Sequence, residues 1–211
     1  MPLHLQESAH ESAGKALRRK PQRPLWNDDY VHRPRYGRHG HLGKLKLQRL
    51  IMEKYAPLLE ADDEVVTHSY VSDIKMPSGR TIALITLDNG KDHTRPNTLG
   101  PHTLLQFAQK LDELKERAKK KEIHGVAVTG KPYYLAAGAD LSHVQDIKER
   151  KIGRLIAELG HYSLEKLDQL GVPSFVFING LALGGGLEIA LNANYRTINE
   201  TAPAVALPEV F

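Results

Sequence analysis

The sequence predicts an α/β protein that follows a disordered basic leader. From residue 65 onward, short apolar runs typical of buried strands alternate with segments whose apolar residues recur at helical spacing, and Gly and Pro mark the joints. Residues 1–43, in contrast, mix Pro, Gly, His and Arg without periodicity, as disordered segments do. We therefore divide the chain into a leader (1–50), a short helical linker (51–64) and an α/β domain (65–211).

Composition limits the kind of protein this can be. The chain has 211 residues and no cysteine, which suits one domain with a tail and excludes disulfides and thiolate catalysis. The N-terminus lacks the apolar segment of a signal peptide, so nothing argues for secretion. No charge-free apolar run is long enough to cross a bilayer. We expect a cytoplasmic protein without a membrane span.

Positive charge is concentrated at the N-terminus. Residues 1–50 hold 11 Lys and Arg against 4 Asp and Glu, a balance of +7, while the rest of the chain has a balance of −3. A basic arm can bind nucleic acid or anionic lipid, but a solvated leader has the same composition. We expect the solvated leader and no nucleic-acid partner. We also hypothesise that Met52 is the natural start, which would make residues 1–51 an upstream extension.

The first half of the pattern predicts a helix, a hairpin, a polar loop and a second helix. Pro suits the first turn of the second helix, and a lysine run suits its C-terminus. In chain order, the expected elements are a helix within Leu45–Leu59, strands Val65–Ile74 and Thr81–Leu87 around the turn Met76–Arg80, the loop Asp88–Gly100, and a helix from Pro101 to the run Lys119–Lys121.

The second half alternates strands and helices. Its expected elements are the strand Ile123–Thr129, helices Leu141–Ile147 and Leu155–Leu170, the strand Ser174–Ile178, the helix Gly186–Asn192, and short strands Tyr195–Ile198 and Val205–Leu207.

Two junctions between a strand and a helix consist of small residues, Leu135–Leu141 and Leu183–Glu188. Small residues expose backbone N–H groups, so Ala139 and Gly185 are candidates to bind one oxygen together, as in an oxyanion hole. Close strand-to-helix packing also demands small residues, and for one junction alone it is the better explanation. Two junctions with acids nearby favour a functional site.

Glu188, at the start of a helix, and Glu209, after a short strand and Pro208, are the candidate acid–base pair. Two carboxylates around one water can add that water to a substrate. For Glu209 alone, an ordinary surface acid is an equal alternative. Nucleotide binding fails on residue identity, because Ile189 stands where the dinucleotide motif needs Gly and no Gly-Lys-Ser/Thr sequence ends the glycine cluster.

Three motifs together resemble the enoyl-CoA hydratase/isomerase (crotonase) family: LAAGADL at 135–141, NGLALGGGLE at 179–188 and LPEVF at 207–211. The resemblance covers roughly residues 68–211 and is strongest to the hydratase part of multifunctional fatty-acid oxidation proteins, which carry a 3-hydroxyacyl-CoA dehydrogenase as well. It implies a crotonase-type ββα spiral. It also implies hydration of 2-enoyl-CoA to 3-hydroxyacyl-CoA in fatty-acid β-oxidation.

The resemblance assigns roles to the candidate residues. Ala139 and Gly185 are expected to bind the thioester oxygen through their N–H groups, Glu188 to activate water for attack at Cβ, and Glu209 to supply the proton to Cα. The segment that is expected to contact CoA comprises Ala137, Ala139, Asp140 and Leu141. Asp140 also suits a helix cap. The loop residues His93 and Arg95 are candidates for the CoA phosphates, although a solvated loop explains them equally well.

The resemblance further implies acyl-CoA as substrate, no covalently bound cofactor, NAD only where a dehydrogenase part is present, and a homo-oligomer for the full-length protein. The chain ends two residues after Glu209, so we expect an incomplete, N-terminal portion of the fold with little hydratase activity by itself. Two alternatives stay open. One is a crotonase-fold isomerase, and the other is a non-catalytic fragment or binding module whose basic leader makes the contacts.

Overall fold

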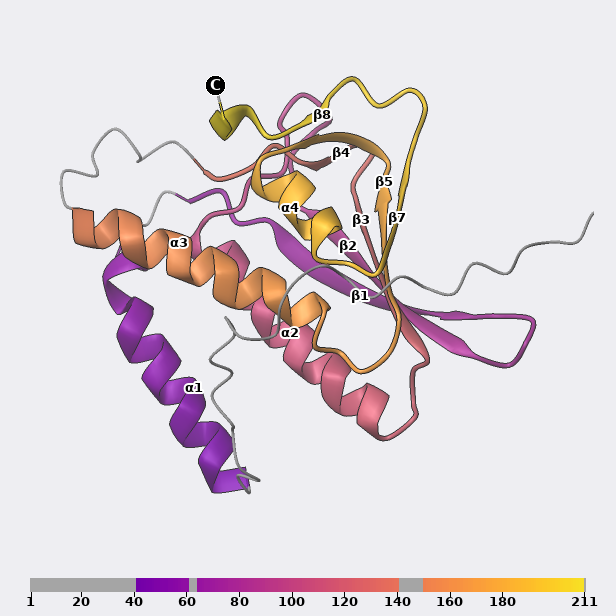
Figure 1. The fold of residues 1–211 in the computed structure, drawn as a ribbon, viewed down its shortest axis with the longest axis horizontal. Helices are drawn as coiled ribbons and strands as arrows, with labels where there is room; N and C mark the ends of the chain where they lie inside the picture. Colours follow the sequence, from indigo (N-terminus) through magenta and orange to yellow (C-terminus); the bar gives the residue numbers. More distant parts are fainter. Residues whose placement is uncertain (1–40, 61–63, 141–149, 211) are drawn as a thin grey trace, which may run out of the picture.

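The computed structural model describes residues 41–60, 64–140 and 150–210. The expected hairpin forms one edge of a five-stranded sheet (Figure 1). Its strands, β1 (His68–Lys75) and β2 (Thr81–Asp88), pair antiparallel in register from His68 opposite Asp88 to Lys75 opposite Thr81. The turn between them closes through Gly79, whose φ of +79° is a conformation that glycine adopts without strain.

The remaining strands of this sheet run parallel to β2. They are β3 (Gly125–Gly130), β5 (Ser174–Ile178) and β7 (Tyr195–Ile198), and the sheet order is β1-β2-β3-β5-β7. The sequence predicted β5 and β7 with these bounds. β3 begins two residues later than predicted, because the chain first turns through Lys121, which has a positive φ.

A second, three-stranded parallel sheet was not predicted. Its order is β4-β6-β8, with β4 (Tyr133–Ala136), β6 (Gly180–Leu183) and β8 (Val205–Ala206). Each of these strands is the next element after a strand of the first sheet, so that β3 leads to β4, β5 to β6 and β7 to β8. The sequence predicted a short strand at Val205–Leu207, where β8 lies. It did not predict β4 and β6, because strands of four residues are too short to show a strand pattern.

Helices complete a repeating strand–strand–helix unit. α3 (Arg150–Leu164) is the next described element after β4, α4 (Gly185–Leu191) follows β6, and the 3-10 turn η5 (Pro208–Val210) follows β8. This arrangement is a ββα spiral. The helix predicted at Leu155–Leu170 is wrong in its bounds, because the chain tightens after Leu164 into the 3-10 turn η4 (Glu165–Leu167). The helix expected at Leu141–Ile147 lies outside the described residues, as does the leader up to residue 40.

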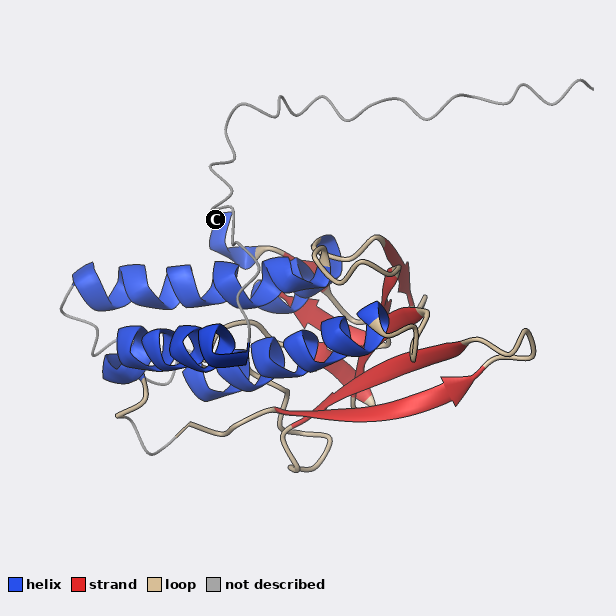
Figure 2. Ribbon diagram, turned by 90° about the horizontal axis from the view of Figure 1, so that it is seen from below, coloured by secondary structure: helices blue, strands red, loops and turns tan. Residues whose placement is uncertain are grey.

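The helices gather on one side of the strands, as Figure 2 shows, and the core lies between the two layers. α2 (Pro101–Lys119) supplies fully buried Leu111 and Leu114, and the sheet supplies Ile85, Leu87 and Val126. Each such side chain stabilises the fold by roughly 1.5–3 kcal/mol relative to exposure. The apolar spacing that predicted α2 therefore corresponds to the buried face of the helix.

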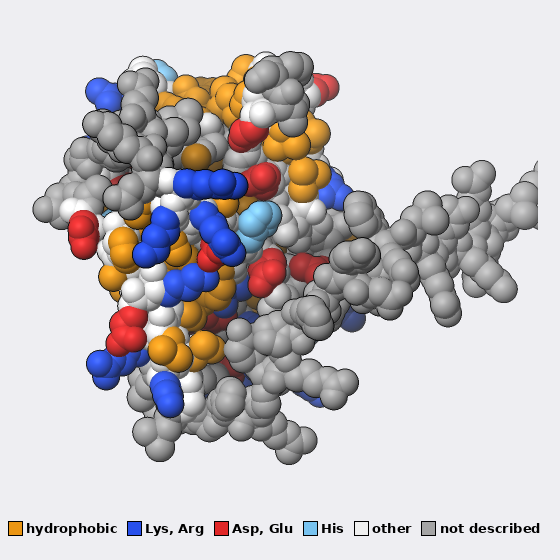
Figure 3. All heavy atoms as spheres, turned by 60° about the vertical axis from the view of Figure 1, so that its left-hand side comes forward, with side chains coloured by type: hydrophobic (Ala, Val, Ile, Leu, Met, Phe, Trp, Pro, Cys, Tyr) orange, Lys and Arg blue, Asp and Glu red, His pale blue; other side chains and the backbone are white. Residues whose placement is uncertain are grey.

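A helix that precedes the hairpin packs against α3. α1 (His41–Tyr55) starts earlier than the expected helix, includes Met52 in its last turn, and continues into the 3-10 turn η2 (Ala56–Leu58). Tyr55 is buried beside Tyr162, with the ring centroids 6.2 Å apart. Glu158 of α3 accepts hydrogen bonds from Lys54 at 2.8 Å and from Arg154 at 2.7 Å. Figure 3, which turns this side forward, shows basic and acidic side chains next to one another. None of the described helices has the length and apolarity that a membrane span requires.

Candidate active site

The N–H of Ala139 is held in a defined direction by the neighbouring loop. Leu99 and Ala139 form an isolated parallel bridge, in which Leu99 N–H donates to Gly138 O at 2.9 Å and Asp140 N–H donates to Leu99 O at 3.3 Å. A trans peptide points its C=O and N–H in opposite directions. The Ala139 N–H therefore points away from Leu99, and within the described ranges it donates to no protein oxygen.

The N–H of Gly185 is fixed by the first turn of α4. Glu188 N–H donates to Gly184 O at 2.9 Å, so the same trans geometry turns the Gly185 N–H away from the helix. Gly184 N–H donates to Ala206 O at 3.0 Å, which ties this turn to β8. Among the described residues, the Gly185 N–H also has no protein acceptor. Each junction thus presents one unused backbone donor.

The two junctions lie against each other. A Cβ at Gly138, where φ is +92°, would lie 3.0 Å from Leu183 O and 3.7 Å from Gly184 Cα. A Cβ at Gly185 would lie 4.0 Å from Gly138 Cα. A Cβ at Gly138 would be tight against this backbone, and the positive φ of Gly138 favours glycine in any case. The structure therefore brings the Ala139 and Gly185 segments together, as their small residues suggested.

Both acids lie beside this junction. Glu188 Oε2 is 3.8 Å from the position of a Cβ on Gly185, and the Glu209 carboxylate lies against Gly184. Both side chains are exposed. The four residues expected to be catalytic thus lie around one short stretch of backbone, where the ends of β4, β6 and β8 meet.

The expected CoA segment is only partly available for hydrogen bonding. Ala137 N–H already donates to Asn97 O at 2.7 Å, and Asp140 N–H to Leu99 O, so neither backbone donor is free for a ligand. The side chain of Ala139 is exposed. Leu141 lies outside the described residues, as does the helix that Asp140 was expected to cap.

The loop after β2 is organised by groups that the sequence analysis did not single out. Lys131, Asn89 and Asn97 are all buried, and their side chains hydrogen-bond to one another or to the loop backbone. A third side-chain amide, Asn179 Nδ2, donates to Lys131 O at 2.8 Å and to Gly130 O at 3.0 Å. No local sequence pattern marked these polar residues, because their hydrogen bonds join segments that are distant in the chain.

His93 and Arg95 lie in this loop and are exposed. The ring of His93 stands edge-on to that of Tyr133, with centroids 6.3 Å apart. Asp92, the residue before His93, closes a turn. Its carboxylate accepts hydrogen bonds from the hydroxyl of Thr94 at 2.6 Å and from the Thr94 N–H at 2.7 Å. These two hydrogen bonds hold the pKa of the Asp92 carboxyl below its ordinary value, and the bond from the hydroxyl has the larger effect.

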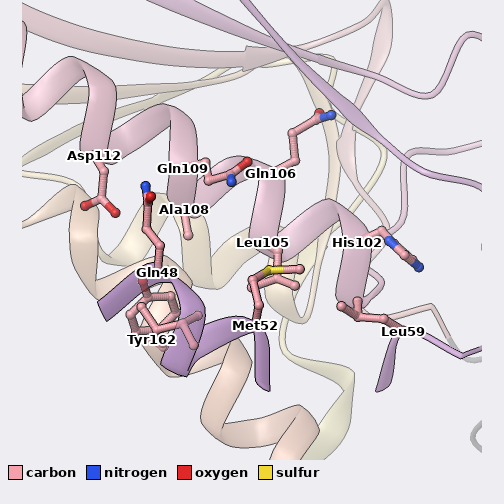
Figure 4. Close-up of a pocket in the computed structure, with 11 residues that line it drawn as sticks. Gln48, Met52, Leu59, His102, Leu105, Gln106, Ala108, Gln109, Asp112 and Tyr162 are labelled. Atoms are coloured by element: carbon pink, nitrogen blue, oxygen red, sulfur yellow. The ribbon is translucent and has the colours of Figure 1, made fainter. Parts of the chain in front are cut away.

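A groove of about 260 Å³ lies elsewhere, between α1, η2, α2 and α3 (Figure 4). Apolar side chains of Met52, Leu59 and Leu105 line it together with the amide side chains of Gln48 and Gln109. None of the residues expected to be catalytic lines this groove.

The fold and the site define an α/β protein of repeated strand–strand–helix units, in which two backbone donors and two carboxylates meet where the short strands end. The model of the enoyl-CoA hydratase/isomerase family matches residues 78–210, and the chain belongs to this family. The crotonase-type spiral expected from the sequence is thereby confirmed.

Several known proteins are similar to the chain. The fatty acid oxidation complex subunit alpha of Pseudomonas syringae pv. tomato is 39% identical over 112 residues, which are 51% of this chain and 15% of that protein. A probable enoyl-CoA hydratase of Bacillus subtilis is 28% identical over 137 residues, 65% of this chain and 50% of that protein.

Solved structures agree with these relatives. Pseudomonas aeruginosa DspI matches with a TM-score of 0.53 and 30% identity, covering 68% of this chain and 54% of that one. The enoyl-CoA hydratase from Bacillus anthracis matches with a TM-score of 0.54 and 26% identity, covering 64% and 48%. The chain therefore spans about half the length of these structures, and less than a fifth of the fatty acid oxidation subunits.

Proposed function

We propose that the chain carries the thioester site of an enoyl-CoA hydratase of fatty-acid β-oxidation. The observation that carries the proposal is the position of Glu188 and Glu209 beside the Gly184–Gly185 peptide, which lies against Gly138. Two acids and two unused backbone donors at one place are what the addition of water to a conjugated thioester requires. Membership of the enoyl-CoA hydratase/isomerase family supports the same class of reaction.

In the proposed reaction, the N–H groups of Ala139 and Gly185 bind the thioester oxygen. The Glu188 carboxylate accepts a proton from water as the water oxygen bonds to Cβ, and the Cα–Cβ π electrons move toward the thioester, whose oxygen gains negative charge. The Glu209 carboxylic acid then gives its proton to Cα. One water is added in total, and proton exchange with solvent resets the two acids.

The backbone donors and the acids are expected to make contributions of similar size. Removing one such donor from an oxyanion hole costs about 3–4 kcal/mol of transition-state stabilisation, because the donor is already aimed at the developing charge. Each acid is expected to contribute roughly 10²- to 10⁴-fold in rate. Both carboxylates are exposed in this chain, and water around them weakens electrostatic effects. We therefore still expect slow turnover from the 211 residues alone.

The proposal includes acyl-CoA thioesters as substrates, no bound cofactor for the hydration itself, a cytoplasmic location and a homo-oligomeric assembly. A link to NAD arises only if the protein also has a dehydrogenase part like that of the multifunctional proteins. An isomerase of the same fold moves a proton within its substrate and adds no water. The retention of two acids, Glu188 and Glu209, favours the hydratase.

The test is single-turnover hydration of crotonyl-CoA with the chain in excess, followed by the loss of the conjugated-thioester absorbance. Glu188→Gln and Glu209→Gln should each slow the reaction by about 10²-fold or more. Glu113→Gln, which changes an exposed acid on α2, is the matched control and should leave the rate unchanged. A hydration rate that survives either substitution would contradict the role proposed for that carboxylate.

A further inference from the structure

Within the part of the chain that the structure describes, the buried ammonium group of Lys131 hydrogen-bonds to no carboxylate. Lys131 directly follows β3, and its side chain is only 5% exposed. Nζ donates to Asn89 Oδ1 at 2.6 Å, Lys91 O at 2.9 Å and Asp92 O at 3.0 Å. An ammonium has three donors, so every one is used on a neutral oxygen. Burying a charge is costly, and this geometry compensates for it only while the loop keeps its shape.

The backbone of Lys131 is held on both sides. Its N–H donates to Leu87 O at 2.9 Å in β2, and its carbonyl oxygen accepts from Asn179 Nδ2 at 2.8 Å, just after β5. The side chain therefore extends from a rigid point, where three strands end, toward a loop whose residues Lys91 and Asp92 are exposed. Lys131 is therefore the fixed partner in this contact, and its ammonium holds the conformation of the loop.

A chain of hydrogen bonds leads from this ammonium to β4 and to the segment after it, which carries Ala139. Asn89 N–H donates to Asn97 Oδ1 at 3.1 Å, and Asn97 Nδ2 donates to Leu135 O at 3.1 Å. Asn97 O in turn accepts from Ala137 N–H at 2.7 Å. Two residues further on, the bridge between Leu99 and Ala139 sets the direction of the Ala139 N–H.

We propose that Lys131 is a positioning residue for the thioester site: its ammonium fixes the loop from Asn89 to Leu99, and the loop in turn fixes the direction of the Ala139 N–H. The inference rests on the proposed function for the identity of the group that this N–H binds. When the ammonium is absent, water can hydrate the carbonyl groups of Lys91 and Asp92, which belong to exposed residues. The loop then separates from the strand, and the Ala139 N–H loses its orientation.

The absence of cysteine from the chain allows a chemical test of the charge alone. K131C places the only thiol of the protein at this position. Alkylation in urea with 2-bromoethylamine, followed by refolding, gives an S-aminoethyl side chain with the length and charge of lysine. Alkylation with 1-bromopropane gives an S-propyl side chain of the same length without charge. Wild-type chain taken through the same steps controls for the treatment.

The first measurement is amide hydrogen exchange. In the S-propyl form, protection of the Leu99 and Ala137 amides should fall about 10- to 100-fold, because the loop opens locally, while that of Val128 in β3 stays unchanged. The S-aminoethyl form should restore wild-type protection. Equal protection of Leu99 in the two alkylated forms would overturn the proposal, since only the charge differs between them. A uniform fall at all three amides would overturn it too, because it would show a general structural role.

The second measurement reports on the thioester. Carbonyl polarisation in bound, carbonyl-¹³C-labelled crotonyl-CoA is read from its ¹³C shift. The downfield shift should be present with the S-aminoethyl form and largely lost with the S-propyl form. A shift retained by the S-propyl form would overturn the positioning role. Absence of binding to the wild-type chain would instead overturn the proposed function, while the exchange data would still decide whether Lys131 orients the loop.

Lys166 supplies the matched control. Its ammonium is also largely buried, but it pairs with Asp112 at 2.7 Å between η4 and α2. K166C, alkylated in the same two ways, should alter overall stability. The Leu99 exchange and the thioester shift should be the same in its S-aminoethyl and S-propyl forms. A K166C effect on Leu99 equal to that of K131C would overturn a specific role for Lys131.

Discussion

The helix-covered part of the five-stranded sheet and the three-stranded sheet are held together by different interactions. The first buries large side chains such as Ile85, Leu111 and Leu114 between strands and helices. The second consists of strands of four, four and two residues and contributes mainly small side chains to the interior, such as Ala136 and Ala182. Apolar area stabilises the first region, whereas close backbone approach and hydrogen bonds stabilise the second.

This difference explains where the candidate site lies. Small residues let backbones approach closely, and close approach places N–H groups where a ligand oxygen can reach two of them. At Gly180 and Gly186 an added Cβ would collide with backbone atoms of Tyr133 and Ala136. The region that carries the site therefore has little side-chain packing, and its backbone N–H groups stay accessible to a ligand. Neighbours such as Lys131 hold this backbone in place.

The largest expected effect is on the helix-covered core. Leu111→Ala removes a side chain that is 1% exposed, and the lost burial together with the remaining cavity should lower the free energy of unfolding by about 2–5 kcal/mol. Urea unfolding followed by circular dichroism measures the change as a lower midpoint with little change in slope. Leu50→Ala, at a side chain that is 52% exposed, is the control and should stay within about 0.5 kcal/mol. Equal losses at the two sites would contradict the assignment of the core.

A smaller and more local effect is expected in the second sheet. In Gly186→Ala the new Cβ meets the backbone of Ala136, including its carbonyl carbon at 2.9 Å, so α4 and β4 must move apart. Overpacking of this kind costs about 1–3 kcal/mol. Hydrogen exchange should show the loss at amides of β4 and β6, with β3 protected as before.

Gly160 in α3 offers the control for this substitution. No atom lies within 4 Å of a Cβ added there, and alanine suits a helix better than glycine. Gly160→Ala should therefore raise stability by about 0.5–1 kcal/mol. A gain at both glycines would show that β4 and α4 can separate freely, contrary to the contrast between the two regions.

The sequence predicts the helix-covered region well because its signals are periodic. The leucines of α2 recur on one face, and apolar runs mark β2, β3 and β5, so the elements follow from burial alone. The last turn of α3 was misjudged because Leu167 and Leu170 continue the apolar pattern although the chain has already tightened into η4. Local pattern shows which side chains are buried, but it does not show how tightly the backbone is wound.

The second sheet could not be read from the sequence in this way. A four-residue strand such as Gly180–Leu183 has too few positions to show a period, and its pairing with Tyr133–Ala136 joins segments far apart in the chain. The candidate site was nevertheless found, because glycine clusters and acids are visible one residue at a time. The loop network around Asn89 and Lys131 was missed, since a hydrogen bond between distant polar residues leaves no local signal.

The smallest expected effect concerns the loop that links the two regions. The Thr94 hydroxyl holds the pKa of Asp92 below its ordinary value of 3.8, so the ionised carboxylate stabilises the turn. With a lowered folded pKa, this stabilisation is fully present above pH 3.8 and is lost as the pH falls through the folded pKa.

Thr94→Val removes the hydroxyl donor and keeps the N–H donor, so the pKa of Asp92 should rise toward 3.8 without reaching it. A ¹³C NMR titration of the Asp92 carboxyl measures both values, and hydrogen exchange of the Val128 amide in β3 is the control that should not change. An unchanged Asp92 midpoint would mean that the turn owes nothing to the hydroxyl. Faster exchange at Val128 would mean that the substitution disturbs the helix-covered sheet as well, and the two regions would then not be independent.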